Sequence, residues 1–204
     1  MPGTQRTEEQ IATLSTVTRL AEQCGFDEKH SRHVTQLALR LFDELHEPHE
    51  LESTDRFLLE CAGLLHDIGW VEGWKSHHRT ALRIILDTPL LTLNNRERLI
   101  IGSIARYHRK ALPALTHDHY AALSDADQEI VNRLAALLRL ADGLDREHQQ
   151  RVKDLTCKIR PRKVVIRCSA AHSFPEEERA ARDKSDLFEL VYHRKVEIDW
   201  KPKV

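Results

Sequence analysis

A histidine and an aspartate stand side by side in the apolar stretch LLHDIGW, residues 64–70. The leucines before them, and Ile68 and Trp70 after them, predict a buried segment. A charged side chain in such a segment is costly unless a partner or a metal ion compensates it. His66 and Asp67 are therefore candidate metal ligands, and a hydrogen-bonded structural pair is the simpler alternative.

Two more polar residues lie in stretches whose apolar residues recur at helical spacing. His30 begins the stretch HSRHVTQLA, and Asp142 ends the stretch LAALLRLAD. A carboxylate at the C-terminal end of a helix is disfavoured by the helix dipole, so a nearby positive group would account for it. Each residue alone has an ordinary explanation, His30 as a surface histidine and Asp142 as a cap of the turn at Gly143. Taken together with His66 and Asp67, they could bind one ion if three predicted helices converge.

The composition is that of a soluble globular protein of 204 residues, 41% hydrophobic and 31% charged. The net charge of −1 gives no general attraction to nucleic acid or to anionic membranes. Neither a bilayer-spanning apolar run nor a signal-peptide core is present, so we expect a cytoplasmic protein with reduced cysteines. A Cys157–Cys168 disulfide across a hairpin is the alternative. The chain has no P-loop and no G-x-S-x-G motif, which excludes those nucleotide-binding and hydrolase classes.

Thirteen histidines are present, and we expect some at the surface, among them His46, His49 and His148. Helical periodicity extends to about residue 147. Capping signals and apolar spacing predict helices between Thr7 and Gly25, from Asp27 to Leu45, over 54–68 and 77–87, from Asn94 or Asn95 to Tyr107, and from Ser124 to Ala141.

The pattern changes near residue 150. The stretch VKDLTCKIRPRKVVIRCSA alternates with period two around Pro161, which predicts a β-hairpin. PEEERAARDKSDLFELVY predicts one helix and KVEIDW a closing strand. The expected fold class is mainly α, with a helical bundle over residues 1–150 and a small C-terminal α+β unit of ββαβ order over residues 151–204. The two parts can share a core.

The order His30, His66-Asp67, Asp142 resembles the metal-binding signature of the HD superfamily of phosphohydrolases. The segments CAGLLHDIGW, RERLIIGSIARYHRKALP and RLAALLRLADGLDR are similar to the C-terminal HD-type module of the exopolyphosphatase/guanosine pentaphosphate phosphatase (Ppx/GppA) family. This resemblance covers most of the chain and implies an HD-domain helical bundle. Thr80 departs from it, because relatives often have a further histidine there. Nothing resembles the N-terminal actin-like domains that carry the hydrolysis in full-length members, so that activity is not implied.

The resemblance also implies a second metal position. In HD phosphohydrolases with two metals, Asp67 would bridge both ions, and His78 and His108 would complete the second site, with His77 as the alternative to His78. Mixed imidazole and carboxylate ligands suit Mn, Fe, Co, Ni or Zn better than Mg or Ca. The expected cofactor is therefore one or two divalent transition-metal ions.

The predicted function is that of a metal-dependent phosphohydrolase acting on a nucleotide-like phosphate ester or phosphoanhydride. Asp67, His78 and His108 would form the catalytic centre, and the phosphate oxygens would be bound by Arg106, Arg109, Lys110 and Arg146. The expected partner is a phosphorylated small molecule or polyphosphate. We expect no binding to a membrane and no specific binding to nucleic acid. A homodimer is compatible with these expectations.

Two alternatives stay open at this point. The chain could be a non-catalytic regulatory or dimerisation module that binds polyphosphate or an alarmone through its basic residues. It could also be a scaffold whose metal ion is purely structural.

Overall fold

Helices make up most of the part of the chain that the computed structural model describes, residues 6–202. The segment before residue 150 contains α1 (Glu8–Gln23), α2 (Glu28–Glu44), α3 (His46–His49), α4 (Ser53–Leu65), the 3-10 helix η1 (Ile68–Glu72), α5 (His77–Asp87), α6 (Asn95–Arg106), α7 (Asp118–Ala121) and α8 (Asp125–Gly143). The prediction of a mainly α protein is confirmed.

The helix starts follow the capping residues of the sequence. Thr7 and Gln10 form a reciprocal capping box at α1, and the Asp27 side chain accepts a hydrogen bond from the backbone N–H of His30 at α2. Asn94 and Ser124 accept hydrogen bonds in the same way at α6 and α8. Because these contacts satisfy backbone donors that a helix leaves unpaired, they determine where each helix begins.

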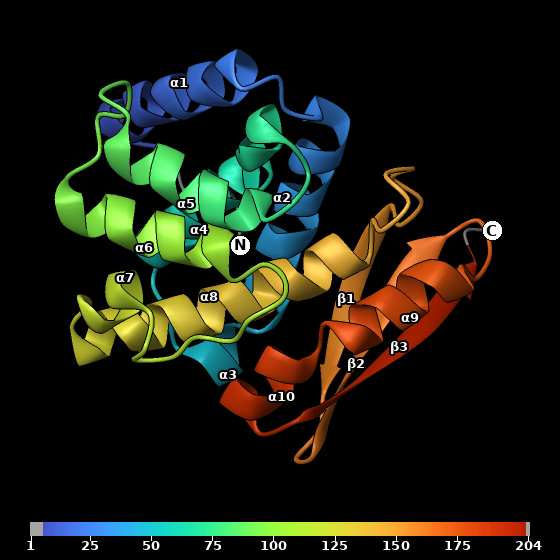
Figure 1. Cartoon of the computed structure of the whole chain (residues 1–204). Helices are drawn as coiled ribbons and strands as arrows, with labels where there is room; N and C mark the ends of the chain where they lie inside the picture. The colour runs from blue at the N-terminus through green and yellow to red at the C-terminus, as the bar shows by residue number, and fades with distance from the viewer. Residues whose placement is uncertain (1–5, 203–204) are drawn as a thin grey trace.

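Helix α8 occupies the centre of the molecule (Figure 1). It packs against α2 and α6 on one side and against the C-terminal helices α9 (Pro175–Asp183) and α10 (Asp186–Tyr192) on the other. Residues 134–138 and 140–141 of α8 are fully buried apolar residues. Buried residues from both sides of residue 150 belong to one continuous hydrophobic cluster.

The C-terminal unit contains a three-stranded sheet of order β1 (Asp154–Ile159), β2 (Lys163–Ala170) and β3 (Lys195–Pro202). β1 and β2 form the expected antiparallel hairpin, and β3 runs parallel to β2 after the crossover through α9 and α10 (Figure 1). The sequence predicted one helix in this crossover, and that detail was wrong. The helix breaks at Ser185, whose hydroxyl donates to the carbonyl of Arg182 and so competes with the helical pattern.

Three further expectations need correction. Helix α4 ends at Leu65 and not at Ile68, because the chain tightens into η1 after His66 and Asp67. Trp70, expected in the core, is 46% exposed. His49, expected at the surface, is fully buried, with its ring nitrogens bonded to the carbonyl of Phe42 and the N–H of Leu51.

The four cysteines are free thiols, as expected. Cys157 lies opposite Ile166 and Cys168 opposite Leu155, so the hairpin register does not bring the two thiols into a pair. Among the helices of residues 6–202, none combines the length and the apolar character that crossing a bilayer requires.

Candidate metal centre

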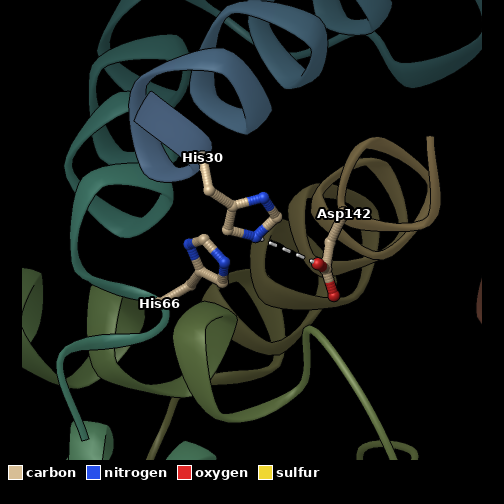
Figure 2. Close-up of side chains that lie close together, drawn as sticks. All are labelled: His30, His66 and Asp142. Atoms are coloured by element: carbon tan, nitrogen blue, oxygen red, sulfur yellow. Dashed lines mark ion pairs between the residues drawn. The ribbon is translucent and has the colours of Figure 1, made fainter. Parts of the chain in front are cut away.

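Three helices bring His30, His66 and Asp142 together in the interior. His30 lies in the first turn of α2, His66 ends α4, and Asp142 lies in the last turn of α8. Figure 2 shows both imidazoles and the carboxylate facing one another. One potential ligand atom of each residue lies within 4.8 Å of those of the other two, and all three residues are buried. The structure thus brings together three of the four residues named as candidates for a first metal position.

A second buried group consists of Asp67, His77 and His108. Asp67 connects this group with the first one, because one of its carboxylate oxygens faces each group. Its Oδ2 lies 3.4 Å from Nε2 of His66 and 3.8 Å from Nε2 of His30. Its Oδ1 lies 3.1 Å from Nε2 of His77 and 3.5 Å from Nε2 of His108. A carboxylate placed in this way can be shared by two cations.

The four histidines of these groups have the same tautomer. In each ring Nδ1 donates to an oxygen acceptor: Asp145 Oδ2 for His30 at 2.9 Å, and the carbonyls of Gly63 for His66 at 2.7 Å, Trp74 for His77 at 2.9 Å and Ala105 for His108 at 2.6 Å. The proton of a neutral ring is then on Nδ1, and the lone pair of Nε2 points to the carboxylates. Such orientation by an outer acceptor is typical of metal-ligating histidines.

Several inward-facing atoms have no hydrogen-bond partner among the described residues. They include Nε2 of His30, Nε2 of His66 and Oδ1 of Asp67. Buried polar atoms normally have hydrogen-bond partners. Nitrogen and oxygen atoms that lack such partners and lie close together are therefore candidate ligands for a cation. Imidazole nitrogens combined with carboxylate oxygens are a donor set for divalent transition metals, and the residues present therefore fit such an ion.

The electrostatics of the first group also favour positive charge. Burial alone would lower the pKa of His30, but the nearby carboxylates of Asp142 and Asp145 outweigh it and raise the pKa to about 10. Burial is likewise outweighed at Asp67, where the neighbouring histidines hold the carboxyl pKa well below its usual range. A proton and a metal ion would compete for Nε2 of His30, so any metal binding there would release that proton.

His77, and not His78, takes part in the second group. His77 opens α5 with its Nε2 toward Asp67, whereas the buried His78 turns away and its Nδ1 has no partner. Adjacent helical residues point about 100° apart, so only one of the two can face Asp67. The structure therefore places His77, the alternative to His78, beside Asp67.

A basic pocket of about 510 Å³ opens beside the second group. It is lined by Trp74, Lys75, Ser76, His77, His78, Arg79, Arg106, Arg109, Lys110 and Ala111, without any carboxylate. Three of the four predicted phosphate-binding residues are therefore together, while Arg146 lies exposed after α8 and is not among the lining residues. Nη1 of Arg109 lies 3.4 Å from Nε2 of His77, which connects the pocket to the ligand group.

Arg106 is the most unusual of these cations, because it is only 3% exposed and its Nη1 has no hydrogen-bond partner. Burial first, and then the positive charges of Arg106 and its neighbours, lower the pKa of His78 to about 3. The pocket thus has a positive potential and an unsatisfied donor, which are the properties of an anion site.

Sequence reasoning missed two residues at this centre. Asp145, which orients His30, is three residues beyond Asp142 in LADGLD, and that spacing could have suggested it. Lys184, which follows α9, pairs with Oδ2 of Asp142. No pattern in RDKSD distinguishes this lysine, since its role depends on how the C-terminal unit packs against α8.

The family model described as "Ppx/GppA phosphatase, domain III" matches residues 13–184. That match includes all of the residues in the two groups and in the basic pocket.

Three curated relatives are each named guanosine-5'-triphosphate,3'-diphosphate pyrophosphatase. The protein from Vibrio vulnificus is 28% identical over 189 residues, covering 91% of this chain and 36% of the relative. Those from Pseudoalteromonas translucida and Pseudoalteromonas atlantica are 27% and 26% identical, covering 68% and 63% of this chain and 29% and 25% of the relatives. The chain thus spans about a quarter to a third of the length of these proteins.

Proposed function

Because the chain belongs to the Ppx/GppA phosphatase domain III family, we propose that it is itself a phosphohydrolase of the metal-dependent HD type. Its substrate in this proposal is a nucleotide-like phosphate ester or phosphoanhydride. The curated relatives are named as pyrophosphatases, which supports phosphohydrolase chemistry at the level of the family, although this chain matches only about a quarter to a third of their length.

One observation carries the proposal: four buried histidines are locked by their Nδ1 hydrogen bonds so that every Nε2 faces Asp67 or Asp142. Nε2 of His30 and Nε2 of His66 have no hydrogen-bond partner among the described residues, and buried polar atoms are costly in that state unless a ligand binds there. The arrangement is best explained as a ligand set.

In this proposal His30, His66, Asp67 and Asp142 hold one divalent ion, and Asp67, His77 and His108 hold a second. Ions of this kind lower the pKa of water toward neutrality and offset charge on phosphoryl oxygens. The protein contributes the fixed positions of its ligands and a buried environment in which charges interact strongly.

The basic pocket would hold the phosphate groups of the substrate. Arg106 and Arg109 can each grip two phosphate oxygens with the planar guanidinium, whereas Lys110 acts as a point charge. Water then adds to phosphorus, the bond from phosphorus to the leaving oxygen breaks, and a proton from the water passes to that oxygen. The products are inorganic phosphate and either the free alcohol of an ester or the shortened phosphate chain of an anhydride. The indole of Trp74, 67% exposed at the pocket, is available to the remainder of the substrate.

The test combines elemental analysis with a phosphate-release screen over nucleotides, alarmones and polyphosphate. We expect one or two transition-metal ions per purified chain and release of phosphate from at least one compound. Asp67→Ala should abolish both metal loading and turnover without unfolding the protein. Asp87→Ala is the matched control, because Asp87 is an exposed carboxylate at the end of α5.

Normal activity of the Asp67→Ala variant would contradict the proposal. So would a wild-type protein that takes up no metal ion under any condition of reconstitution.

The basic pocket supports a second candidate function, that of a module binding polyphosphate or an alarmone without catalysis. Its lining contains five Lys and Arg residues, and their charge does not depend on a metal ion. Metal-free protein that binds tripolyphosphate tightly and releases no phosphate would favour this function over hydrolysis. If the metal is only structural, chelation should lower the melting temperature and the screen should detect no activity.

A further inference from the structure

Lys184 reaches from the C-terminal unit into the metal centre. It is the residue directly after α9, and its ammonium pairs with Oδ2 of Asp142. The other carboxylate oxygen of Asp142 lies 3.5 Å from Nε2 of His30. The Lys184 side chain is 21% exposed, so it lies at the border between the buried ligands and solvent.

The backbone around Lys184 is held against α8 on both sides. A methyl group at Gly143 would lie 2.6 Å from Cα of Ala181, which means that α8 and α9 touch through their backbones. Asp186 accepts hydrogen bonds of 2.7 and 2.8 Å from Nη2 of the buried Arg139, which belongs to α8. These contacts hold the segment that carries Lys184 against α8.

Anchoring the C-terminal unit does not require the Lys184 pair. The ion pair between the buried Arg139 of α8 and Asp186 already provides such a contact.

The charge balance indicates what Lys184 does when the centre holds its ions. Asp142 would then neutralise a divalent cation, and the ammonium would face a centre with excess positive charge. Repulsion from the ions would weaken its pair with Asp142, so a further anion beside the ammonium would be stabilising. A phosphate dianion has the charge and the acceptor oxygens for this.

We propose that Lys184 is a substrate-contacting residue that binds a phosphoryl oxygen, so that the C-terminal unit completes the active site. The inference rests on the proposed function and adds a residue to it. In the metal-free protein Lys184 pairs with Asp142, and with metal and phosphate present it transfers to the phosphate.

The experiment compares wild type with Lys184→Met and Lys184→Arg, each loaded with Mn²⁺, and measures metal content and the affinity for inorganic phosphate by calorimetry. Lys184→Met should bind Mn²⁺ as wild type does or more tightly, because a competing cation is gone. Its phosphate affinity should fall by about tenfold or more, and Lys184→Arg should recover most of that loss. Lys163→Met, which removes an exposed lysine of β2, is the control and should change neither quantity.

Unchanged phosphate affinity in Lys184→Met would overturn the inference. So would a loss of Mn²⁺ binding in that variant, because Lys184 would then only position Asp142. Either result, obtained beside a wild type that binds ion and phosphate, leaves the proposed function standing. A wild type that takes up no ion refutes the proposed function and this inference together.

Discussion

Asp145 accepts a hydrogen bond of 2.9 Å from Nδ1 of His30, and the contact joins residues 115 positions apart in the chain. Both side chains are buried, and Asp145 also accepts a 2.7 Å bond from the backbone N–H of Gln150. The turn after α8 therefore determines the direction of a ring that belongs to α2. His148 from the same turn stacks on His30 with the ring centroids 3.6 Å apart.

We predict that Asp145→Asn weakens metal binding about 10–100-fold, the usual effect of losing a carboxylate that orients a ligating histidine. The amide can still bond to Nδ1, but it adds no negative charge, so His30 becomes a poorer ligand. Titration with Mn²⁺ would measure this. His148→Ala, which removes only the stacked ring, should have a smaller effect, and equal affinity of Asp145→Asn and wild type would contradict the assigned role.

Two neighbouring histidines provide a matched pair for the second metal position. His77→Ala should lower the metal content by about one ion per chain, because its Nε2 lies 3.1 Å from the shared carboxylate. His78→Ala should keep the full content, since its ring faces the basic pocket. Elemental analysis of both variants tests this directly. The reverse result would restore the assignment of His78 that the family resemblance implied.

Arg106→Met should separate anion binding from stability. Affinity for tripolyphosphate should fall about tenfold or more, because a charged hydrogen-bond donor is lost. The free energy of unfolding should stay equal or rise, since the variant removes a buried charge whose Nη1 has no partner. Arg32→Met makes the same change of net charge on the exposed part of α2 and is the control. Unfolding of the Arg106 variant would indicate a structural role instead.

Gly69 permits a close approach between η1 and α5. A methyl group there would lie 1.9 Å from the carbonyl oxygen of His77 and 2.7 Å from the backbone nitrogen of Ala81. Gly69→Ala should therefore cost about 1–3 kcal/mol or more and displace His77, with weaker metal binding as a second effect. Urea denaturation measures the first and Mn²⁺ titration the second.

Gly102→Ala is the control for that variant. Its methyl group would meet only the end of the Leu82 side chain, at 2.8 Å, which can move aside. Alanine is also favoured over glycine within a helix by about 1 kcal/mol, which offsets the adjustment. Similar losses in both variants would argue against the close approach at Gly69 as the cause.

His49 should make stability depend on pH. Its Nε2 donates to the carbonyl of Phe42 and its Nδ1 accepts the N–H of Leu51, so the folded protein needs the neutral ring. Burial, the largest influence, holds its pKa below the usual 6.5. The unfolded chain therefore binds a proton first as pH falls, and stability declines from about pH 6.5 down to the folded pKa, by at most about 1.4 kcal/mol per pH unit.

Urea denaturation of wild type and His49→Asn at pH 7.5 and 5.5 tests this prediction. The variant should be less stable at pH 7.5 and should lose less stability between the two pH values. The residues of the metal centre titrate in the same way in both proteins. Their effect therefore cancels when the pH-dependent changes in unfolding free energy of the two proteins are compared. Parallel pH profiles would exclude His49 as the cause.

Local signals of the sequence determined the six longer helices before residue 150, the hairpin and four of the ligand candidates. Capping residues at Thr7, Asp27 and Ser124 act on backbone groups a few positions away, so their effect can be seen in the sequence itself. His66 and Asp67 stood out because polar residues are rare in an apolar helix end.

Only the tertiary structure decided which of His77 and His78 faces Asp67, because that depends on the rotation of α5 against η1. Asp145 and Lys184 joined the centre for the same reason: each reaches its partner across helix packing, by contacts that span 115 and 42 positions. Side-chain direction across a packed interface is set by the shape and volume of both surfaces, and neither surface is encoded by local residue spacing.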